Sequence, residues 1–69
     1  MLVKDVVKAN NTDLISVHSS FHNDILPVSK NYFIGRYEDD AIWETEVESW
    51  SVDEYDGNYD HETILLITI

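Results

Sequence analysis

The segment TILLITI, residues 63–69, is the feature that most limits what this chain can fold into. Side chains alternate between the two faces of a strand. A run that is apolar at both odd and even positions is therefore covered on both faces or lies centrally in a sheet. The chain has 69 residues and no cysteine, so its core must form without disulfides or thiolate metal sites. We therefore predict that folding needs Ile64, Leu66, Ile67 and Ile69.

Two patterns near the N-terminus predict a helix followed by a strand. In LVKDVVKA, at roughly 100° per residue, the apolar side chains share an arc of about 140° and the charged ones lie opposite. This pattern indicates a short amphipathic helix that ends at the turn-forming NNTD. DLISVHSS alternates instead, with Ile15 and Val17 on one face and Ser16 and His18 on the other, as a half-buried strand does.

The middle of the chain predicts two further strands around a turn. Proline cannot donate to a β ladder, so the second strand is expected to begin after Pro27 and to run through SKNYFIGRY. A turn or a single helical turn is expected at residues 40–46, where Asp39 and Asp40 are placed to cap it. Strand formers that alternate with serine in VESWSVDEY predict a strand from about residue 47 to 54.

The last two strands are expected to pair as an antiparallel hairpin. Its loop is DGNYDHE, in which Asp56, Gly57 and Asn58 are residues that tolerate positive φ. The sum of these elements is one α+β domain over residues 1–69. We predict a short N-terminal helix packed on a three- to four-stranded, mainly antiparallel sheet.

The charge of the chain is strongly asymmetric, with a formal net charge of −10 at pH 7. Up to Arg36 there are four bases against three acids, and from Tyr37 onward there are eleven acids and no base. One explanation is solubility, because acidic side chains keep small proteins in solution. Eleven uncompensated carboxylates also repel one another in a fold with little core, which favours a functional acidic surface.

A row of carboxylates is the arrangement by which such a surface could act. Glu44, Glu46 and Glu48 would form one if their segment is extended, because residues two apart in a strand point the same way at a spacing of about 6.6 Å. DNA also presents regularly spaced anions, which proteins hold largely through lysine and arginine. The row could therefore occupy a site built for a phosphate backbone. Trp43 and Trp50, which flank the row, are expected in the core, because a small domain needs large side chains to fill its interior. A place at the interface stays open as the alternative, because tryptophan often anchors interfaces.

No motif indicates catalysis or a bound cofactor. His18 and His22 are four residues apart, as zinc-binding pairs on a helix are, but they lie in a predicted strand and turn without the glutamate of a metalloprotease. Val52 stands where a calcium loop counted back from Gly57 needs an acid. The chain also has no glycine-rich phosphate loop. We predict no enzymatic activity, no cofactor and no metal site.

The cellular location is predicted from what the chain lacks. Charged residues interrupt the apolar ones in MLVKDVVKAN, so no signal peptide is expected. No apolar stretch approaches the roughly 20 residues of a membrane span. Together with the absence of cysteine, these features predict a protein of the host bacterial cytoplasm.

In its overall profile the chain resembles the small phage-encoded inhibitors of bacterial defence. The shared features are an initial VKDVVK helix, a few strands, a strongly acidic second half and no cysteine. Anti-CRISPR proteins that act on the Cas9 effector are the nearest group, with anti-restriction DNA mimics beside them. The resemblance implies a stoichiometric inhibitor that occupies the positively charged surface where the effector reads its PAM or holds DNA. This chain departs from a full mimic in its nearly neutral first half, which contains Lys4, Lys8, Lys30 and Arg36.

These expectations define a partner-binding surface without catalytic residues. The expected partner is a basic nucleic-acid-binding protein, specifically a CRISPR effector nuclease, with no direct binding of nucleic acid or membrane. A second interpretation stays open, in which the chain is a phage or mobile-element interaction module or homodimer whose acidity serves solubility alone. The salt dependence of association distinguishes the two interpretations, because salt weakens binding between opposite charges and does not weaken association through apolar strands. The candidate surface combines seven carboxylates with two exposed tyrosines: Glu44, Glu46, Glu48, Asp53, Glu54, Asp56, Asp60, Tyr55 and Tyr59.

Overall fold

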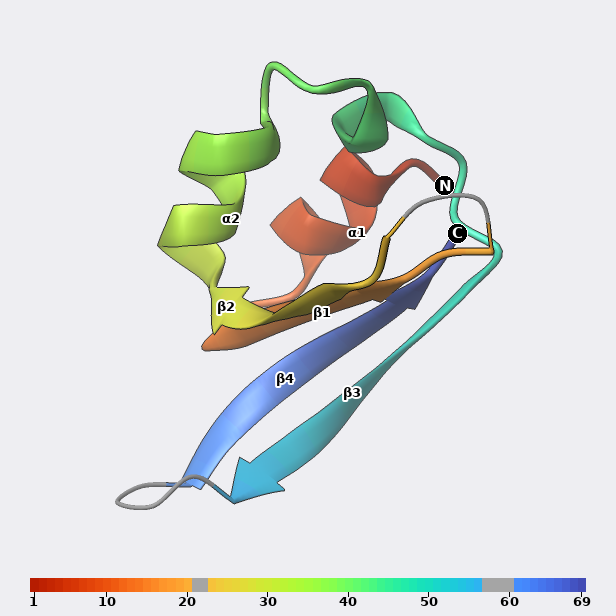
Figure 1. Ribbon diagram of the computed structural model, residues 1–69. Helices are drawn as coiled ribbons and strands as arrows, with labels where there is room; N and C mark the ends of the chain where they lie inside the picture. Colours follow the sequence, from red (N-terminus) through yellow and green to blue (C-terminus); the bar gives the residue numbers. More distant parts are fainter. Residues whose placement is uncertain (21–22, 57–60) are drawn as a thin grey trace.

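The computed structural model describes residues 1–20, 23–56 and 61–69, with only the backbone of Tyr55, Asp56 and His61 (Figure 1). Its elements in chain order are α1 (Val3–Ala9), β1 (Leu14–His18), β2 (Ile25–Ser29), α2 (Lys30–Tyr37), the 3-10 helix η1 (Ala41–Glu44), β3 (Ser49–Asp56) and β4 (His61–Thr68). The described strands form one sheet in the order β2-β1-β4-β3. β1 and β4 are parallel, whereas β1–β2 and β3–β4 are antiparallel. The predicted α+β fold with a mainly antiparallel sheet is confirmed.

The helices all lie on one face of the sheet (Figure 1), and the core fills the space between the two layers. Its members come from every described element except β3. β3 lies at the edge of the sheet, away from α1 and α2 (Figure 1). The buried cluster consists of Val3, Val6, Val7, Ile15, Val17, Ile25, Phe33, Ile42, Trp43, Leu65, Ile67 and Ile69.

The first helix and the first strand form where they were predicted. Val3, Val6 and Val7 are fully buried, which places the apolar arc of α1 against the sheet. The N-terminal residues are also held by the later chain, because Val3 N–H donates to the Thr45 carbonyl at 2.9 Å and Val47 N–H donates to the Met1 carbonyl at 2.8 Å. The start of the chain therefore pairs with the segment that leads into β3.

The predicted second strand is wrong in its position. Pro27 lies inside β2 and not before it, and the segment SKNYFIGRY forms α2. β2 tolerates proline because it is an edge strand, where an N–H facing solvent is not needed. Ser29 is the N-cap of α2, and its side chain accepts the Tyr32 N–H at 3.2 Å. Phe33 and Tyr37 lie one helical turn apart with ring centroids separated by 4.9 Å, so packing overrides the strand propensity of the aromatic residues.

The helical turn predicted at residues 40–46 is confirmed as η1. Asp40 caps it, accepting the Ile42 N–H at 3.1 Å. Trp43 is 8% exposed and its ring centroid lies 6.4 Å from that of Phe33, so the prediction of a core position is confirmed. The same prediction for Trp50 is wrong, because this tryptophan lies on β3 and is 43% exposed.

The β3–β4 hairpin extends beyond the rest of the sheet (Figure 1). Its register runs from Ser49↔Thr68 to Asp56↔His61, whereas β1 pairs only with Ile64–Thr68 of β4. Residues 54–56 and 61–63 therefore form a two-stranded projection, which we call the hairpin arm. The predicted hairpin and the central position of the last strand are both confirmed.

Asp13 anchors the base of the hairpin arm. Its carboxylate accepts the Thr63 N–H at 3.0 Å and the Thr63 hydroxyl at 3.2 Å, and its own N–H donates to the Thr63 carbonyl at 3.1 Å. These bonds tie β4 to the start of β1 where the two strands part. The arm therefore leaves the body of the protein at a defined point.

The apolar residues of β4 differ in burial according to the face of the sheet on which they lie. Leu65 and Ile67 are at most 1% exposed beneath the helices, and Ile69, just after the strand, is 6% exposed. Leu66 points to the opposite face and is 38% exposed, while Ile64 on that face is 4% exposed. Three of the four residues expected in the core are thus buried, and Leu66 is not.

Candidate functional site

The predicted row of carboxylates does not form. Glu44 is the last residue of η1, Glu46 forms an isolated bridge with Leu2, and Glu48 lies at a bend before β3. A 3-10 turn does not project alternate residues in one direction, so the regular strand spacing is lost. The row depended on an extended segment from Glu44 to Glu48, and this condition is not met.

Two of these carboxylates already have cationic partners within the protein. Lys4 Nζ lies 3.2 Å from Glu44 Oε1, and the N-terminal ammonium lies 3.0 Å from Glu46 Oε1. The Glu44 and Glu46 side chains are 70% and 73% exposed, so each pair is worth roughly 0–1 kcal/mol. The sequence predicted eleven acids without a cationic partner in the same protein, and Glu44 and Glu46 each have one.

Three further acids of the candidate surface lie on β3 or just before it. Glu48, Asp53 and Glu54 are exposed. Within residues 1–20, 23–56 and 61–69, no ion pair involves any of these three. Asp53 and Glu54 are neighbours on a strand and point to opposite faces, so the charge surrounds the edge rather than covering one face.

The basic residues are all on the helices. Lys4 and Lys8 belong to α1, and Lys30 and Arg36 belong to α2. Lys30 Nζ donates to the Asn10 carbonyl at 2.9 Å, and the Arg36 guanidinium lies 5.0 Å from the centroid of the Tyr37 ring. All four lysine and arginine side chains thus lie in the helical layer, and β3 has none.

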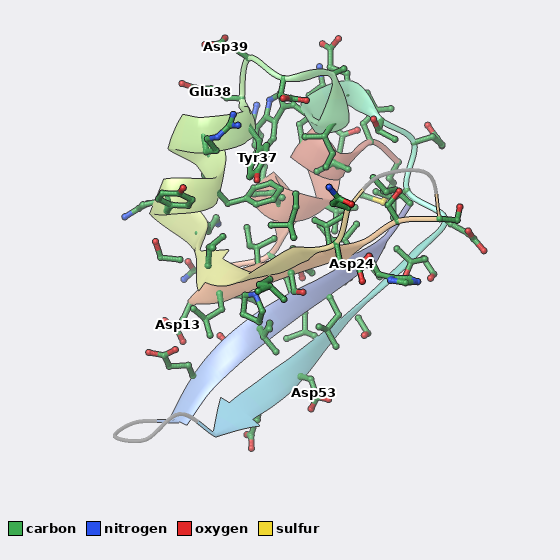
Figure 2. The ribbon with its side chains drawn as sticks, viewed as in Figure 1. Asp13, Asp24, Tyr37, Glu38, Asp39 and Asp53 are labelled. Atoms are coloured by element: carbon green, nitrogen blue, oxygen red, sulfur yellow. The ribbon has the colours of Figure 1, made fainter. Side chains whose placement is uncertain are left out.

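Two acids of the second half lie far from the acids of β3. Glu38 and Asp39 follow α2 and lie at the opposite end of the molecule from Asp53, with Tyr37 beside them (Figure 2). They are as exposed as the acids of β3 but form no part of the candidate surface. This separation gives a matched set of acids for testing where a partner binds.

The remaining predicted residues are only partly placed. Tyr55 and Asp56 pair through their backbones with Glu62 and His61, which puts both residues in the hairpin arm. Tyr59 and Asp60 lie outside the described residues. Their roles stay predictions from the sequence.

Two apolar residues of β3 belong to this surface and were not predicted there. Trp50 and Val52 are 43% and 47% exposed. They lie directly opposite Ile67 and Leu65 of β4, so they point to the helical side of the sheet. The helices do not extend over β3 (Figure 1). The alternation with serine was visible in the sequence, but no local signal tells which face of a strand another layer covers.

A second polar contact lies at the other end of β1. His18 Nδ1 is 2.9 Å from Asp24 Oδ1, and the Ser19 N–H donates to the same oxygen at 3.2 Å. The Ser19 N–H, followed by the contact with His18, holds the pKa of Asp24 below its ordinary value of 3.8. Both side chains are more than half exposed, so the contact orders the β1–β2 connection without forming a buried site. Figure 2 shows Asp24 away from the hairpin arm.

The described residues contain neither a metal-binding cluster nor a membrane-spanning helix. No group of three or more histidine, cysteine, aspartate or glutamate side chains in that part of the chain is placed to hold a metal ion. His22, one half of the histidine pair considered above, lies outside it. No helix among the described residues is long and apolar enough to cross a membrane.

No protein-family model, curated protein or solved structure matches this chain.

Proposed function

We propose that this protein is a stoichiometric inhibitor that uses the acidic β3–β4 hairpin to occupy a basic nucleic-acid-binding site on a larger protein. The proposal names a CRISPR effector nuclease as the first partner to test, because of the profile resemblance. The observation that supports it best is a projecting hairpin whose described acids lack internal cations. The binding acids are assigned to Glu48, Asp53 and Glu54, with Asp56 and Asp60 as further candidates.

The physical basis is competition for arginine and lysine. A site that holds DNA binds phosphates with these side chains, and exposed carboxylates on a narrow hairpin offer them the same charge. The acids are in water before binding, so the free protein loses no internal ion pair when they meet cations. Glu44 and Glu46 would contribute less, because they must first exchange Lys4 and the N-terminal ammonium.

The first experiment identifies the partner and asks whether nucleic acid competes with it. The tagged protein is used to capture partners from lysates of CRISPR-bearing bacteria, and each purified partner is then titrated with labelled duplex DNA and this protein. The proposal expects a one-to-one complex that excludes DNA and weakens steeply as salt rises. A partner that binds DNA and this protein together would contradict it.

A second function is supported by the exposed Trp50 and Val52 on an edge strand. Two copies could associate through this edge, with the acidity serving solubility alone. Salt would then strengthen association by screening the acids of the two copies. Sedimentation of the purified protein over a range of sodium chloride distinguishes this homodimer, which grows with salt, from an inhibitor that stays monomeric without its partner.

A further inference from the structure

We propose that the open edge of β3 binds an extended, arginine- or lysine-rich segment of the partner as an additional strand, with Trp50 and Val52 as its apolar contacts. This inference rests on the proposed function for its cationic partner. It adds a mode of recognition, in which backbone pairing supplements the attraction between charges.

The two edges of the sheet differ in how they are protected. The β2 edge contains Pro27, which cannot donate, and its register with β1 shifts between Ile15 and Val17. β3 has no proline or glycine, and its register with β4 is regular over all eight residues. The charged side chains of β3 are all acidic, so this edge discourages acidic partners and remains open to basic ones.

Hydrogen bonds show which backbone groups of β3 face outward. The Glu54 N–H donates to the Asp53 carboxylate at 2.8 Å, so it points away from β4. Outward and inward groups alternate in an antiparallel pair, which directs the N–H groups of Trp50 and Val52 to the open edge as well. At the start of the strand, Glu48 N–H donates at 2.8 Å to the carbonyl of Thr68, which is also the residue opposite Ser49. Two consecutive residues therefore face one residue of β4, as in a β-bulge, and the alternation is counted from Ser49.

The same two residues offer side chains to an added strand. Trp50 and Val52 point to the helical side of the sheet and remain 43% and 47% exposed because only β4 flanks them. A strand paired with the outer edge would place its own side chains beside them and remove apolar area from water. Tryptophan is also among the residues that most often carry binding energy at interfaces.

Charge selects the occupant of this edge. Glu48, Asp53 and Glu54 are exposed on or just before β3. A second copy of the chain would bring the same three carboxylates from each side into contact, which is repulsive. An extended segment with arginine or lysine at alternate positions meets Asp53 with opposite charge on one face of the strand and presents apolar residues to Trp50 and Val52 on the other.

The test uses a nine-residue peptide that alternates arginine with valine, acetylated and amidated at its ends. In the saturated complex at low salt, amide exchange at Trp50 and Val52 should slow at least tenfold. A control peptide with proline in place of valine keeps the charge but cannot form a regular strand, and it should bind at least tenfold more weakly. Equal binding of the two peptides, no binding of the first, or unchanged exchange at both amides would overturn the inference.

A variant of the protein tests the same edge independently. Val52→Pro removes an N–H that faces away from β4, so the ladder with β4 keeps its bonds, while Val52→Thr keeps the N–H. We expect Val52→Pro to weaken peptide binding at least tenfold and Val52→Thr to change it less than threefold. Equal effects would contradict edge pairing, and if circular dichroism shows that Val52→Pro is unfolded, the exchange measurement decides.

The same variants separate this inference from the proposed function. If Val52→Pro still excludes DNA from the partner as well as the unaltered protein does, the acidic inhibitor stands and the edge-pairing mode is wrong. If the arginine peptide binds at the edge but no partner loses DNA, the edge is real and the inhibitor proposal is wrong.

Discussion

The adjacent leucines of β4 give the sharpest test of the fold. Leu65 is fully buried beneath the helices and Leu66, on the other face, is 38% exposed. Substitution of either leucine by alanine removes the same three side-chain carbon atoms. Leu65→Ala removes buried apolar area and leaves a cavity, which costs about 2–5 kcal/mol. Leu66→Ala leaves no closed cavity and removes a group already partly in water, so about 1 kcal/mol is expected.

These costs are large for a chain of this size. Stabilities of roughly 0.05–0.15 kcal/mol per residue give about 3–10 kcal/mol for 69 residues. Domains of this size lose about 4–8 °C of Tm per kcal/mol, so a 3 kcal/mol loss at Leu65 corresponds to a decrease of about 12–24 °C. Leu66→Ala should lower the Tm by only about 4–8 °C.

The assay is thermal and urea unfolding of both variants and of the unaltered protein, monitored by circular dichroism. If Leu65→Ala is partly unfolded at 25 °C, its urea midpoint at 5 °C still gives the comparison. Equal destabilisation by the two substitutions, or a larger loss from Leu66→Ala, would refute the assignment of the two faces of β4.

Three further predictions concern the polar contacts and the charge. The folded pKa of Asp24 is lowered by the Ser19 N–H and by His18, so its stabilising effect is present above about pH 4 and is lost as pH falls through the folded pKa. Urea melts should therefore show Asp24→Asn less stable than the unaltered protein at pH 6, with the difference shrinking as pH falls below that of the ordinary carboxyl titration. Asp13→Ala removes the carboxylate that holds Thr63, so amide exchange in the hairpin arm should quicken and the free energy of unfolding should fall by about 1–2 kcal/mol. Unchanged exchange there would show that the arm does not need this anchor. Added sodium chloride should raise the Tm of the free protein, because its acids outnumber its bases by ten, and a falling Tm would mean that internal ion pairs dominate.

Local periodicity was sufficient for much of the fold. The arc of valines predicted α1, alternation around Ile15 predicted β1, and the doubly apolar TILLITI predicted a central strand. α2 was missed because aromatic residues also suit strands, and the decisive contacts of Phe33 with Tyr37 and Trp43 depend on the packed structure. Ser29 as a helix cap was the available signal.

The candidate surface was predicted in composition but not in geometry. The partners of Glu44 and Glu46 come from the first residues of the chain, more than 35 positions away, and no local pattern reveals such pairs. The exposure of Trp50 depends on how far the helices extend across the sheet. That extent is a property of the tertiary structure, so composition alone placed this tryptophan in the core.

Asp5 and Asp13 are unsuitable as control acids. Asp5 accepts the Leu2 N–H at 3.1 Å and Asp13 anchors the hairpin arm, so reversing either charge would disturb the fold. Glu38 and Asp39 are exposed, belong to no ion pair within the described residues and lie far from Asp53 (Figure 2). They change the net charge by the same amount without touching the hairpin.

The most direct test of the proposed inhibitor is therefore one competition titration with two charge-reversed variants. Labelled duplex DNA bound to the captured partner is displaced by the unaltered protein, by the Asp53→Lys and Glu54→Lys double variant, or by the Glu38→Lys and Asp39→Lys double variant, at fixed salt. Reversal on β3 should raise the concentration needed for half displacement at least thirtyfold, and reversal near α2 should raise it less than threefold. Equal losses from the two variants would contradict a binding site on the β3–β4 hairpin and leave net charge alone as the cause.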